Sequence, residues 1–282
     1  MAYIFPDKIF PNALTYYLQC PFKFKCHNDK EIKAEFVESA ESFLGKVIHM
    51  VLKDFFDVAK VPIDKRKYQD LGEMLKYSWA RVTKNGWSNE YWSADDRIKL
   101  FGSAEQEKAF GLKAIAILNN YISSTDLSVL PLSLEDWMEC NVGEFTIGGR
   151  IDRIEQDSEF SIAVWDYKTG KLPYHNDVEK MMDEDLQVPI YAIIASKHNP
   201  FAKRIRAGLV YIKYSKVYDI VWANDELEKI ENKIIAIIKK AREDNNLSPH
   251  INKLCPWCEY RGICPDKDKI EEKYTKVDEV VW

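Results

Sequence analysis

Two aspartates and one lysine are the residues of this chain whose types and spacing best suit chemistry. Asp152 lies in the stretch GGRIDRIE, and Asp166 and Lys168 lie two residues apart in the stretch AVWDYKTGK. If residues 160–167 form a strand, side chains two positions apart point to the same face. A hairpin from 149–156 to 160–167 would then bring Asp152 alongside, so that two carboxylates and one ammonium converge at one edge of a sheet.

This set of groups suits the hydrolysis of a phosphodiester. Carboxylates bind Mg²⁺ or Mn²⁺, which prefer oxygen ligands. Such an ion polarises the phosphate and helps to make hydroxide from water at neutral pH. A lysine beside it can position that water or offset the charge that builds on the phosphorane. A lone D-x-K pattern also occurs at ordinary charged strand ends, so the interpretation depends on the rest of the chain.

The expected elements place these residues in an α/β sheet core. Apolar residues at helical spacing predict helices, and short apolar runs between turn residues predict strands. Pro21 is expected to stop the first helix, and Gly148-Gly149 to separate two strands. The expected helices are 12–19, 34–58, 65–84, 100–124, 176–198 and 225–243, and the expected strands are 136–148, 149–156, 160–167, 206–213 and 216–222.

Four stretches of the chain match the motifs of one known family, in that family's order. On these motifs the sequence resembles the PD-(D/E)xK nuclease superfamily, and specifically the RecB-like exonucleases with an iron–sulfur cluster. That group includes the CRISPR-associated adaptation exonucleases and the nuclease domains of AddB-type helicase–nucleases. The stretches are GKVIH at 45–49, GRIDRI at 149–154, DYKTGK at 166–171 and LQVPIY at 186–191.

The resemblance extends from Cys20 to Cys264 and implies a restriction-endonuclease-like fold. This fold is a mixed sheet flanked by helices, here with a helical insertion and a C-terminal cysteine segment. The resemblance also implies a metal site for Mg²⁺ or Mn²⁺. Its ligands would be His49, Asp152, Asp166 and the carbonyl of Tyr167. Considered alone, His49 fits a packed helix histidine better than a metal ligand.

The resemblance also assigns roles in catalysis. Lys168 would be the catalytic lysine, acting with Asp152 and Asp166. Gln187 and Tyr191, one helical turn apart on one face, would orient the lysine or contact DNA phosphate. Without the resemblance these two residues would pass for a surface pair. Pro189 between them indicates that the helix starts or kinks there.

Six cysteines in a chain with no apparent signal peptide are better interpreted as metal ligands or core thiols than as disulfides. The tail has the spacing C-x2-C-x5-C, which supplies three ligands where four are usual. The resemblance makes Cys20 the fourth ligand of a [4Fe-4S] cluster, and Zn²⁺ is the alternative for four thiolates. Cys26 and Cys140 fall outside this pattern and are expected to serve as small apolar residues, with Cys26 as an alternative to Cys20. The three tail cysteines are Cys255, Cys258 and Cys264.

The net charge of −5 argues against a protein that coats nucleic acid indiscriminately. It does not exclude a nuclease, whose basic residues need only line one groove. No segment approaches the length of a membrane span, so a cytoplasmic location is expected. The chain is expected to divide into an N-terminal segment with the cluster cysteine, a helical lobe, a nuclease core and a cysteine tail. Their ranges are 1–33, 34–135, 136–245 and 246–282.

Together these features predict a metal-dependent DNA exonuclease that acts on single strands or DNA ends. Recombination, repair and CRISPR adaptation are all compatible settings. A helicase or CRISPR adaptation proteins would be possible partners, on separate chains. Two alternatives remain: a non-catalytic DNA-binding scaffold subunit of a repair or adaptation complex, and a metal-dependent endonuclease.

Overall fold

The computed structural model describes residues 4–29, 31–32, 38–84, 90–173 and 177–274. Within these ranges six strands form one mixed sheet in the order β1–β3–β4–β5–β6, with β2 paired to β3. The pairs β1–β3 and β4–β5 are parallel, and the others are antiparallel. The strands are β1 (Lys8–Ile9), β2 (Pro131–Val142), β3 (Phe145–Ser158), β4 (Ser161–Lys168), β5 (Arg204–Tyr211) and β6 (Lys216–Ala223).

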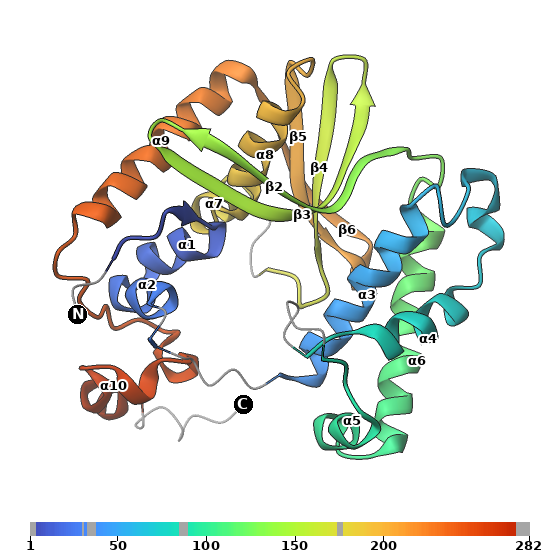
Figure 1. The fold of residues 1–282 in the computed structure, drawn as a ribbon, viewed down its shortest axis with the longest axis horizontal. Helices are drawn as coiled ribbons and strands as arrows, with labels where there is room; N and C mark the ends of the chain where they lie inside the picture. Colours follow the sequence, from blue (N-terminus) through green and yellow to red (C-terminus); the bar gives the residue numbers. More distant parts are fainter. Residues whose placement is uncertain (1–3, 30, 33–37, 85–89, 174–176, 275–282) are drawn as a thin grey trace.

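Each face of the sheet is covered by its own helices (Figure 1), as expected for the α/β class. The helices α8 and α9 cover one face, and α3 and α6 cover the other. No helix of the described residues is long and apolar enough to cross a lipid bilayer. The α-helices are α1 (Pro11–Gln19), α2 (Pro21–Asn28), α3 (Ala40–Phe56), α4 (Leu71–Arg81), α5 (Ala94–Phe101), α6 (Ala104–Ser124), α7 (Val178–Glu184), α8 (Gln187–His198), α9 (Asn224–Glu243) and α10 (Lys267–Tyr274).

Side chains alternate along β4 between the two apolar layers. Ile162 and Val164 pack with α8 and α9, whereas Trp165 and Tyr167 pack with α3 and α6. This is the alternation that the strand pattern predicts. A shift of β4 by one residue would exchange the side chains between the two layers, so this packing fixes the register of the strand. Lys168, at the end of β4, is directed toward α8.

The expected helices of the N-terminal half are shorter and more divided than the sequence predicts. Asp70 accepts backbone N–H groups at the start of α4 and separates it from a 3₁₀-helix at Ile63–Tyr68, so the helix expected at 65–84 is in two pieces. Gly102, with a φ of 85°, ends α5 before α6 begins. Ser39 caps α3, and the start expected at residue 34 lies outside the described residues.

The strand expected at 136–148 is wrong, because the chain reverses direction within it. β2 ends at Val142 and β3 begins at Phe145. Gly143 between them has a φ of 57°, a conformation that glycine adopts without a steric penalty. The hairpin turn therefore lies five residues before the glycine pair that was expected to form it.

The break expected at Gly148-Gly149 is also wrong, because β3 runs through both residues. A Cβ atom at Gly149 would lie only 2.6 Å from the ring of Tyr191, and one at Gly148 would lie 3.3 Å from Cβ of Glu139. The glycines thus leave room for neighbouring side chains. A glycine inside a strand can mark such a close approach of other atoms as well as a break in the strand.

The N-terminal helices pack against the end of α9. Pro21 ends α1, as expected, and it also begins α2, a position where its missing N–H is tolerated. Tyr17 and Phe24 share an apolar cluster with Leu247. The Tyr17 hydroxyl donates a hydrogen bond of 3.2 Å to Asp244 Oδ2. Beyond α9 come the 3₁₀-helices Cys255–Trp257 and Arg261–Ile263 and then α10, whereas 275–282 of the expected tail lie outside the described residues.

Candidate active site

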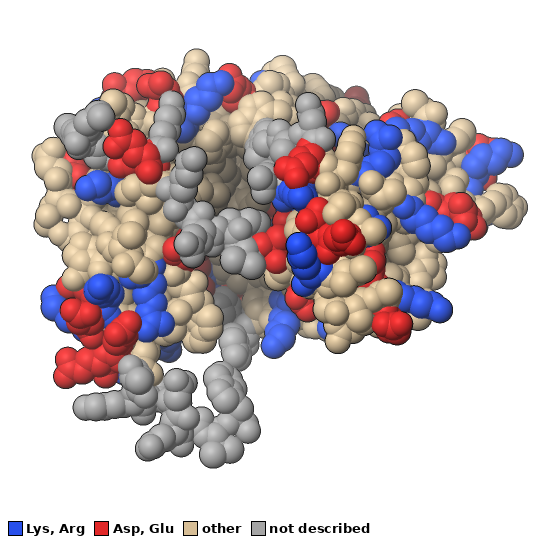
Figure 2. Space-filling model, turned by 60° about the horizontal axis from the view of Figure 1, so that its bottom comes forward, with Lys and Arg blue, Asp and Glu red and all other residues tan. Residues whose placement is uncertain are grey.

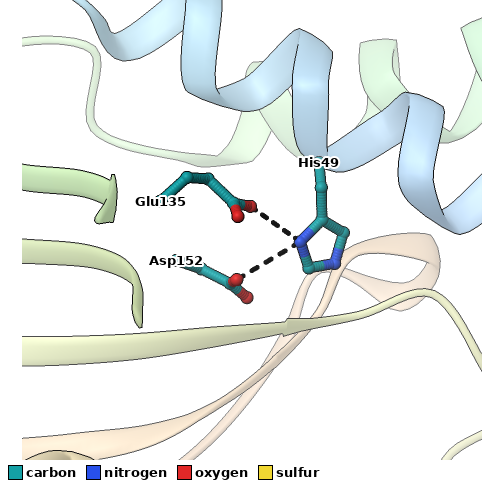
Figure 3. A group of neighbouring side chains, drawn as sticks. All are labelled: His49, Glu135 and Asp152. Atoms are coloured by element: carbon teal, nitrogen blue, oxygen red, sulfur yellow. Dashed lines mark hydrogen bonds and ion pairs between the residues drawn. The ribbon is translucent and has the colours of Figure 1, made fainter. Parts of the chain in front are cut away.

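Side chains from three different elements meet at one point (Figure 3). His49 comes from α3, Glu135 from β2 and Asp152 from β3, and their ligand atoms lie within 4.8 Å of one another. His49 Nδ1 lies 2.9 Å from Glu135 Oε1 and 3.3 Å from Asp152 Oδ1. Its Nε2 lies 3.2 Å from the carbonyl oxygen of Tyr167. One imidazole nitrogen with several oxygens is a donor set that suits a divalent ion such as Mn²⁺ or Mg²⁺.

A chain of polar contacts runs from Asp166 to the first turn of α8. Lys168 Nζ lies 2.6 Å from Asp166 Oδ2 and donates a hydrogen bond of 2.7 Å to Gln187 Oε1. Gln187 Nε2 donates in turn to the hydroxyl of Tyr191 at 3.1 Å. The carboxylate and the amide fix the lysine head from two sides, so the ammonium has a defined position.

The start of α8 places Gln187 and Tyr191 on this chain. α8 begins at Gln187, and Pro189 lies in its first turn, where proline is tolerated. Of the start or kink expected at Pro189, the structure shows a helix start. The single helix expected at 176–198 is wrong, because α7 ends at Glu184 and α8 begins at Gln187. Asp185 Oδ1 accepts the backbone N–H of Gln187 at 3.0 Å and holds this end of the helix.

Asp152 connects the metal-ligand group to the lysine chain. Its Oδ2 accepts the backbone N–H of Tyr167 at 2.6 Å, while its Oδ1 faces His49. The ladder between β3 and β4 ends at the pair Arg153 and Trp165. Beyond that pair the backbone N–H of Tyr167 donates to the Asp152 carboxylate and not to a main-chain carbonyl of β3. This hydrogen bond holds the carboxylate close to Asp166 and Lys168.

The acidic groups of the site have opposite pKa shifts. Burial raises the pKa of Asp166 to about 6, although the Lys168 ammonium opposes this shift. Burial alone would also raise the pKa of Asp152, but His49 and the Tyr167 N–H lower it below its usual value. Burial disfavours the charged form of His49, yet Asp152 and Glu135 raise the pKa of the imidazole well above its ordinary value. The site thus attracts positive charge, and a divalent ion would displace the imidazole proton on binding.

Comparison with known proteins identifies the family. Residues 10–265 match the model of the PD-(D/E)XK nuclease superfamily. This chain belongs to that superfamily. No curated protein matches it.

Two solved structures are similar to this PD-(D/E)XK chain at low sequence identity. SSO0001 is 17% identical, with 93% of this chain and 87% of that chain covered and a TM-score of 0.39. A candidate exonuclease from Eubacterium rectale is 10% identical, with 90% and 88% covered and a TM-score of 0.47.

The structure places every active-site residue expected from the sequence in one region of this PD-(D/E)XK fold. The metal-ligand group contains His49 and Asp152, with the Tyr167 carbonyl beside them. Asp166 lies outside that group of three and contacts Lys168. The roles of these residues remain predictions.

Glu135 is the member of the site that the sequence did not indicate. It has a φ of 52°, so it departs from regular strand geometry, and its Oε2 forms an ion pair of 3.0 Å with Arg150 Nε. The only signal in the sequence is an acidic residue within an otherwise strand-like stretch. That signal cannot be distinguished from a surface residue until the pairing of β2 with β3 is known.

The four cysteines assigned to a cluster line one cavity of about 40 Å³, and Cys26 does not line it. Two of their sulfurs accept backbone N–H bonds, Cys20 from His250 at 3.3 Å and Cys255 from Asn252 at 3.2 Å. Burial raises the pKa of Cys258 and of Cys264, and a backbone N–H group at each sulfur opposes this rise. Backbone donors of this kind stabilise thiolates that bind a metal centre.

Gly149→Ala is expected to disrupt the contacts of Tyr191 and reduce nuclease activity at least about tenfold, with a loss of roughly 1–3 kcal/mol in stability. The added methyl group would lie 2.6 Å from the buried Tyr191 ring, and moving that ring disturbs Gln187 and the lysine that it holds. The matched control is Gly111→Ala on α6, where the added methyl group meets no atom within 4 Å. Equal activity and equal melting temperatures in the two variants would contradict this role of Gly149.

Proposed function

We propose that this chain is a metal-dependent deoxyribonuclease that degrades single-stranded DNA or DNA ends as an exonuclease. The observation that carries the proposal is the fixed Lys168 ammonium beside a group of metal-binding side chains. Membership of the PD-(D/E)XK nuclease superfamily supports the reaction class. The motifs shared with RecB-like nucleases support action on DNA in recombination, repair or CRISPR adaptation, with a helicase or adaptation proteins as partners.

The residues present fit a divalent ion. His49, Glu135 and Asp152 would hold Mg²⁺ or Mn²⁺, with the Asp166 carboxylate and the Tyr167 carbonyl as further oxygen donors. When bound, the ion supplies positive charge to the scissile phosphate and lowers the pKa of a water molecule. Glu135 also forms an ion pair with Arg150. The partly exposed guanidinium of Arg150 therefore lies at the mouth of the site, where it can contact phosphate.

The side chains of the lysine network would do the remaining work. Asp166 and Gln187 orient Lys168, whose ammonium offsets negative charge on the phosphorane or positions the attacking water. Tyr191 supports Gln187 from one turn further along α8. No covalent intermediate with the protein is needed, because water is the nucleophile.

The proposal is tested by digestion of end-labelled linear and circular single-stranded DNA with Mn²⁺, with Mg²⁺ and with EDTA. An exonuclease should degrade the linear strand only with a divalent ion and leave the circle intact. Cleavage of the circle would replace this proposal with the endonuclease alternative. A folded protein that binds DNA but cleaves neither substrate with either ion would favour the scaffold alternative.

The cysteines support a second metal centre, a [4Fe-4S] cluster bound by Cys20, Cys255, Cys258 and Cys264. All four of these cysteines line one small cavity. The motif resemblance to nucleases with an iron–sulfur cluster favours this cluster over Zn²⁺, which four thiolates would also suit. The cavity joins α2 to the tail, and the cluster would act as a structural clasp there.

Cys20→Ser is expected to remove most of the bound iron and the absorbance near 400 nm of anaerobically purified protein, because a cluster with one weak ligand is lost readily. Cys140→Ser is the control, since Cys140 lies on β2 and does not line the cavity. Wild-type protein that contains zinc and no iron would contradict the cluster and leave the nuclease proposal standing. Retention of iron in Cys20→Ser would instead indicate that Cys26 is the fourth ligand.

A further inference from the structure

Two hollows flank the candidate active site, and Arg150 lines both of them. The larger has a volume of about 870 Å³ and includes Gln187 and Tyr191. The smaller has a volume of about 520 Å³ and includes His49 and Glu135. In the space-filling view the molecule is hollowed between the side that carries α1, α2 and α10 and the side that carries α3 to α6 (Figure 2). A nucleic-acid strand that crosses the metal-ligand group would therefore pass from one hollow into the other.

The smaller hollow is the more basic of the two. Its basic side chains are Lys46, Lys53, Lys60, Arg81 and Arg150, and its carboxylates are Asp54 and Glu135. In the larger hollow Arg150 is the one lysine or arginine among the described residues of the lining. A cleft lined mainly by one sign of charge attracts the opposite sign. A polyanion would therefore be held chiefly in the smaller hollow.

Three of the five basic side chains form ion pairs within the chain, namely Lys46 with Glu38, Lys60 with Asp54, and Arg150 with Glu135. The other two, Lys53 and Arg81, have no carboxylate partner among the described residues.

The two unpaired cations come from different helices. Lys53 is partly buried in the last turn of α3. Arg81 ends α4, and its guanidinium lies 4.9 Å from the centroid of the Tyr77 ring. This contact uses the face of a ring, so it gives the N–H donors of Arg81 no oxygen acceptor. Both residues thus bring to the hollow a positive charge that no described carboxylate offsets.

Lys53 lies one helical turn beyond His49 on the same face of α3. Residues four apart on an α-helix are neighbours, and four residues correspond to a rise of roughly 6 Å. This rise is comparable to the distance between consecutive phosphates along a nucleic-acid strand. Both side chains line the smaller hollow. When the scissile phosphate lies at the metal-ligand group, the next phosphate is therefore within reach of the Lys53 ammonium.

We propose that Lys53 and Arg81 form a subsite for the phosphate next to the scissile phosphate, in the smaller hollow. This inference rests on the proposed function and specifies how that function holds its substrate. Contacts with phosphate fix the position of a strand and carry no sequence information. The subsite therefore sets which linkage lies at the metal-ligand group, whatever the bases are.

The test is equilibrium binding of a short single-stranded DNA by protein that carries Lys168→Ala, which suppresses digestion. In this background Lys53→Met keeps an unbranched side chain without the charge, and it is expected to weaken binding roughly 3- to 30-fold. The slope of log affinity against log salt concentration should fall in magnitude by about 0.7, the value for one lost contact with a single strand. Arg81→Met should weaken binding in the same way, whereas Lys53→Arg should keep most of the affinity.

A neutral methylphosphonate linkage, moved along the DNA, locates the phosphate that this subsite contacts. At the linkage next to the one that wild-type protein cuts first, the replacement should weaken binding when Lys53 and Arg81 are both present. In protein with Lys53→Met and Arg81→Met together, it should cause no further loss there, because both changes remove the same contacts.

Lys108→Met is the matched control, since Lys108 is an exposed lysine of α6 that lines neither hollow. Three results would each overturn the subsite: equal affinity of Lys53→Met and Lys108→Met proteins, full additivity with the neutral linkage, and coupling only at a more distant linkage. Any of them would leave the nuclease proposal intact if the wild type digests linear DNA with a divalent ion. Coupling at one linkage in a protein that digests nothing would support the phosphate contact and refute the exonuclease.

Discussion

Lys168→Ala is expected to lower the rate of DNA cleavage by on the order of 10²–10³-fold while the protein remains folded. The ammonium lies 2.6 Å from Asp166 and donates to Gln187, and no other lysine or arginine contacts either group among the described residues. Its removal takes away the positive charge that faces the phosphorane. It also leaves the buried Asp166 without its cation, so the pKa of that carboxyl, already about 6, should rise further.

Single-turnover digestion with excess protein measures this effect without a contribution from product release. Lys229→Ala is the control, because the Lys229 side chain on α9 is 77% exposed. Gln187→Ala should lower the cleavage rate less, by about tenfold. It removes the group that positions the ammonium, but the charge of Lys168 remains. An unchanged rate in Lys168→Ala would refute the assigned mechanism, and a large drop in melting temperature would show that Lys168 is chiefly structural.

Arg66→Leu is expected to destabilise the protein by roughly 3–5 kcal/mol and lower its melting temperature by about 10 °C. Arg66 is 1% exposed and donates hydrogen bonds of 2.8, 2.8 and 2.6 Å to the carbonyls of Phe56, Leu127 and Val129. Leucine matches much of the apolar volume but leaves these carbonyls without a donor. An unpaired buried polar group costs more than the hydrogen bond itself contributes.

The three carbonyls that Arg66 joins explain why the effect should be large. Phe56 ends α3, and the segment with Leu127 and Val129 connects α6 to β2. Arg204→Leu is the control at an exposed arginine, where the change should stay within about 0.5 kcal/mol. Thermal unfolding followed by circular dichroism compares the variants, and a decrease of less than about 2 °C for Arg66→Leu would contradict this role.

Local geometry relates only some of the site residues that the sequence predicts, whereas His49 and Asp152 were indicated through the motif resemblance. Asp166 and Lys168 share a face because of their two-residue spacing, and Gln187 and Tyr191 share one because of helical spacing. Glu135 could not be found in this way. It meets Asp152 only through the pairing of β2 with β3, and its positive φ removes it from the alternation that a strand pattern assumes.

The glycines of β3 show a second limit of sequence analysis. A Gly-Gly pair indicates either a turn or a close approach of other atoms. The choice depends on Tyr191, which is remote in sequence and packs on Gly149 only in the folded chain. The turn occurs at Gly143, where a single glycine gives a weaker signal. The helical and strand content of the core could be predicted, but which glycine reverses the chain could not.

The packing of α1 and α2 on the end of α9 has a consequence for protein synthesis. Ala13, Tyr17 and Phe24 are made early, but Ala241 and Leu247, which bury them, leave the ribosome more than 200 residues later. Until α9 and Leu247 have been made, these side chains lack the contacts that bury them and are open to chaperones or to other chains. The helices α1 and α2 are therefore secured in the native molecule only after the end of α9 has been synthesised.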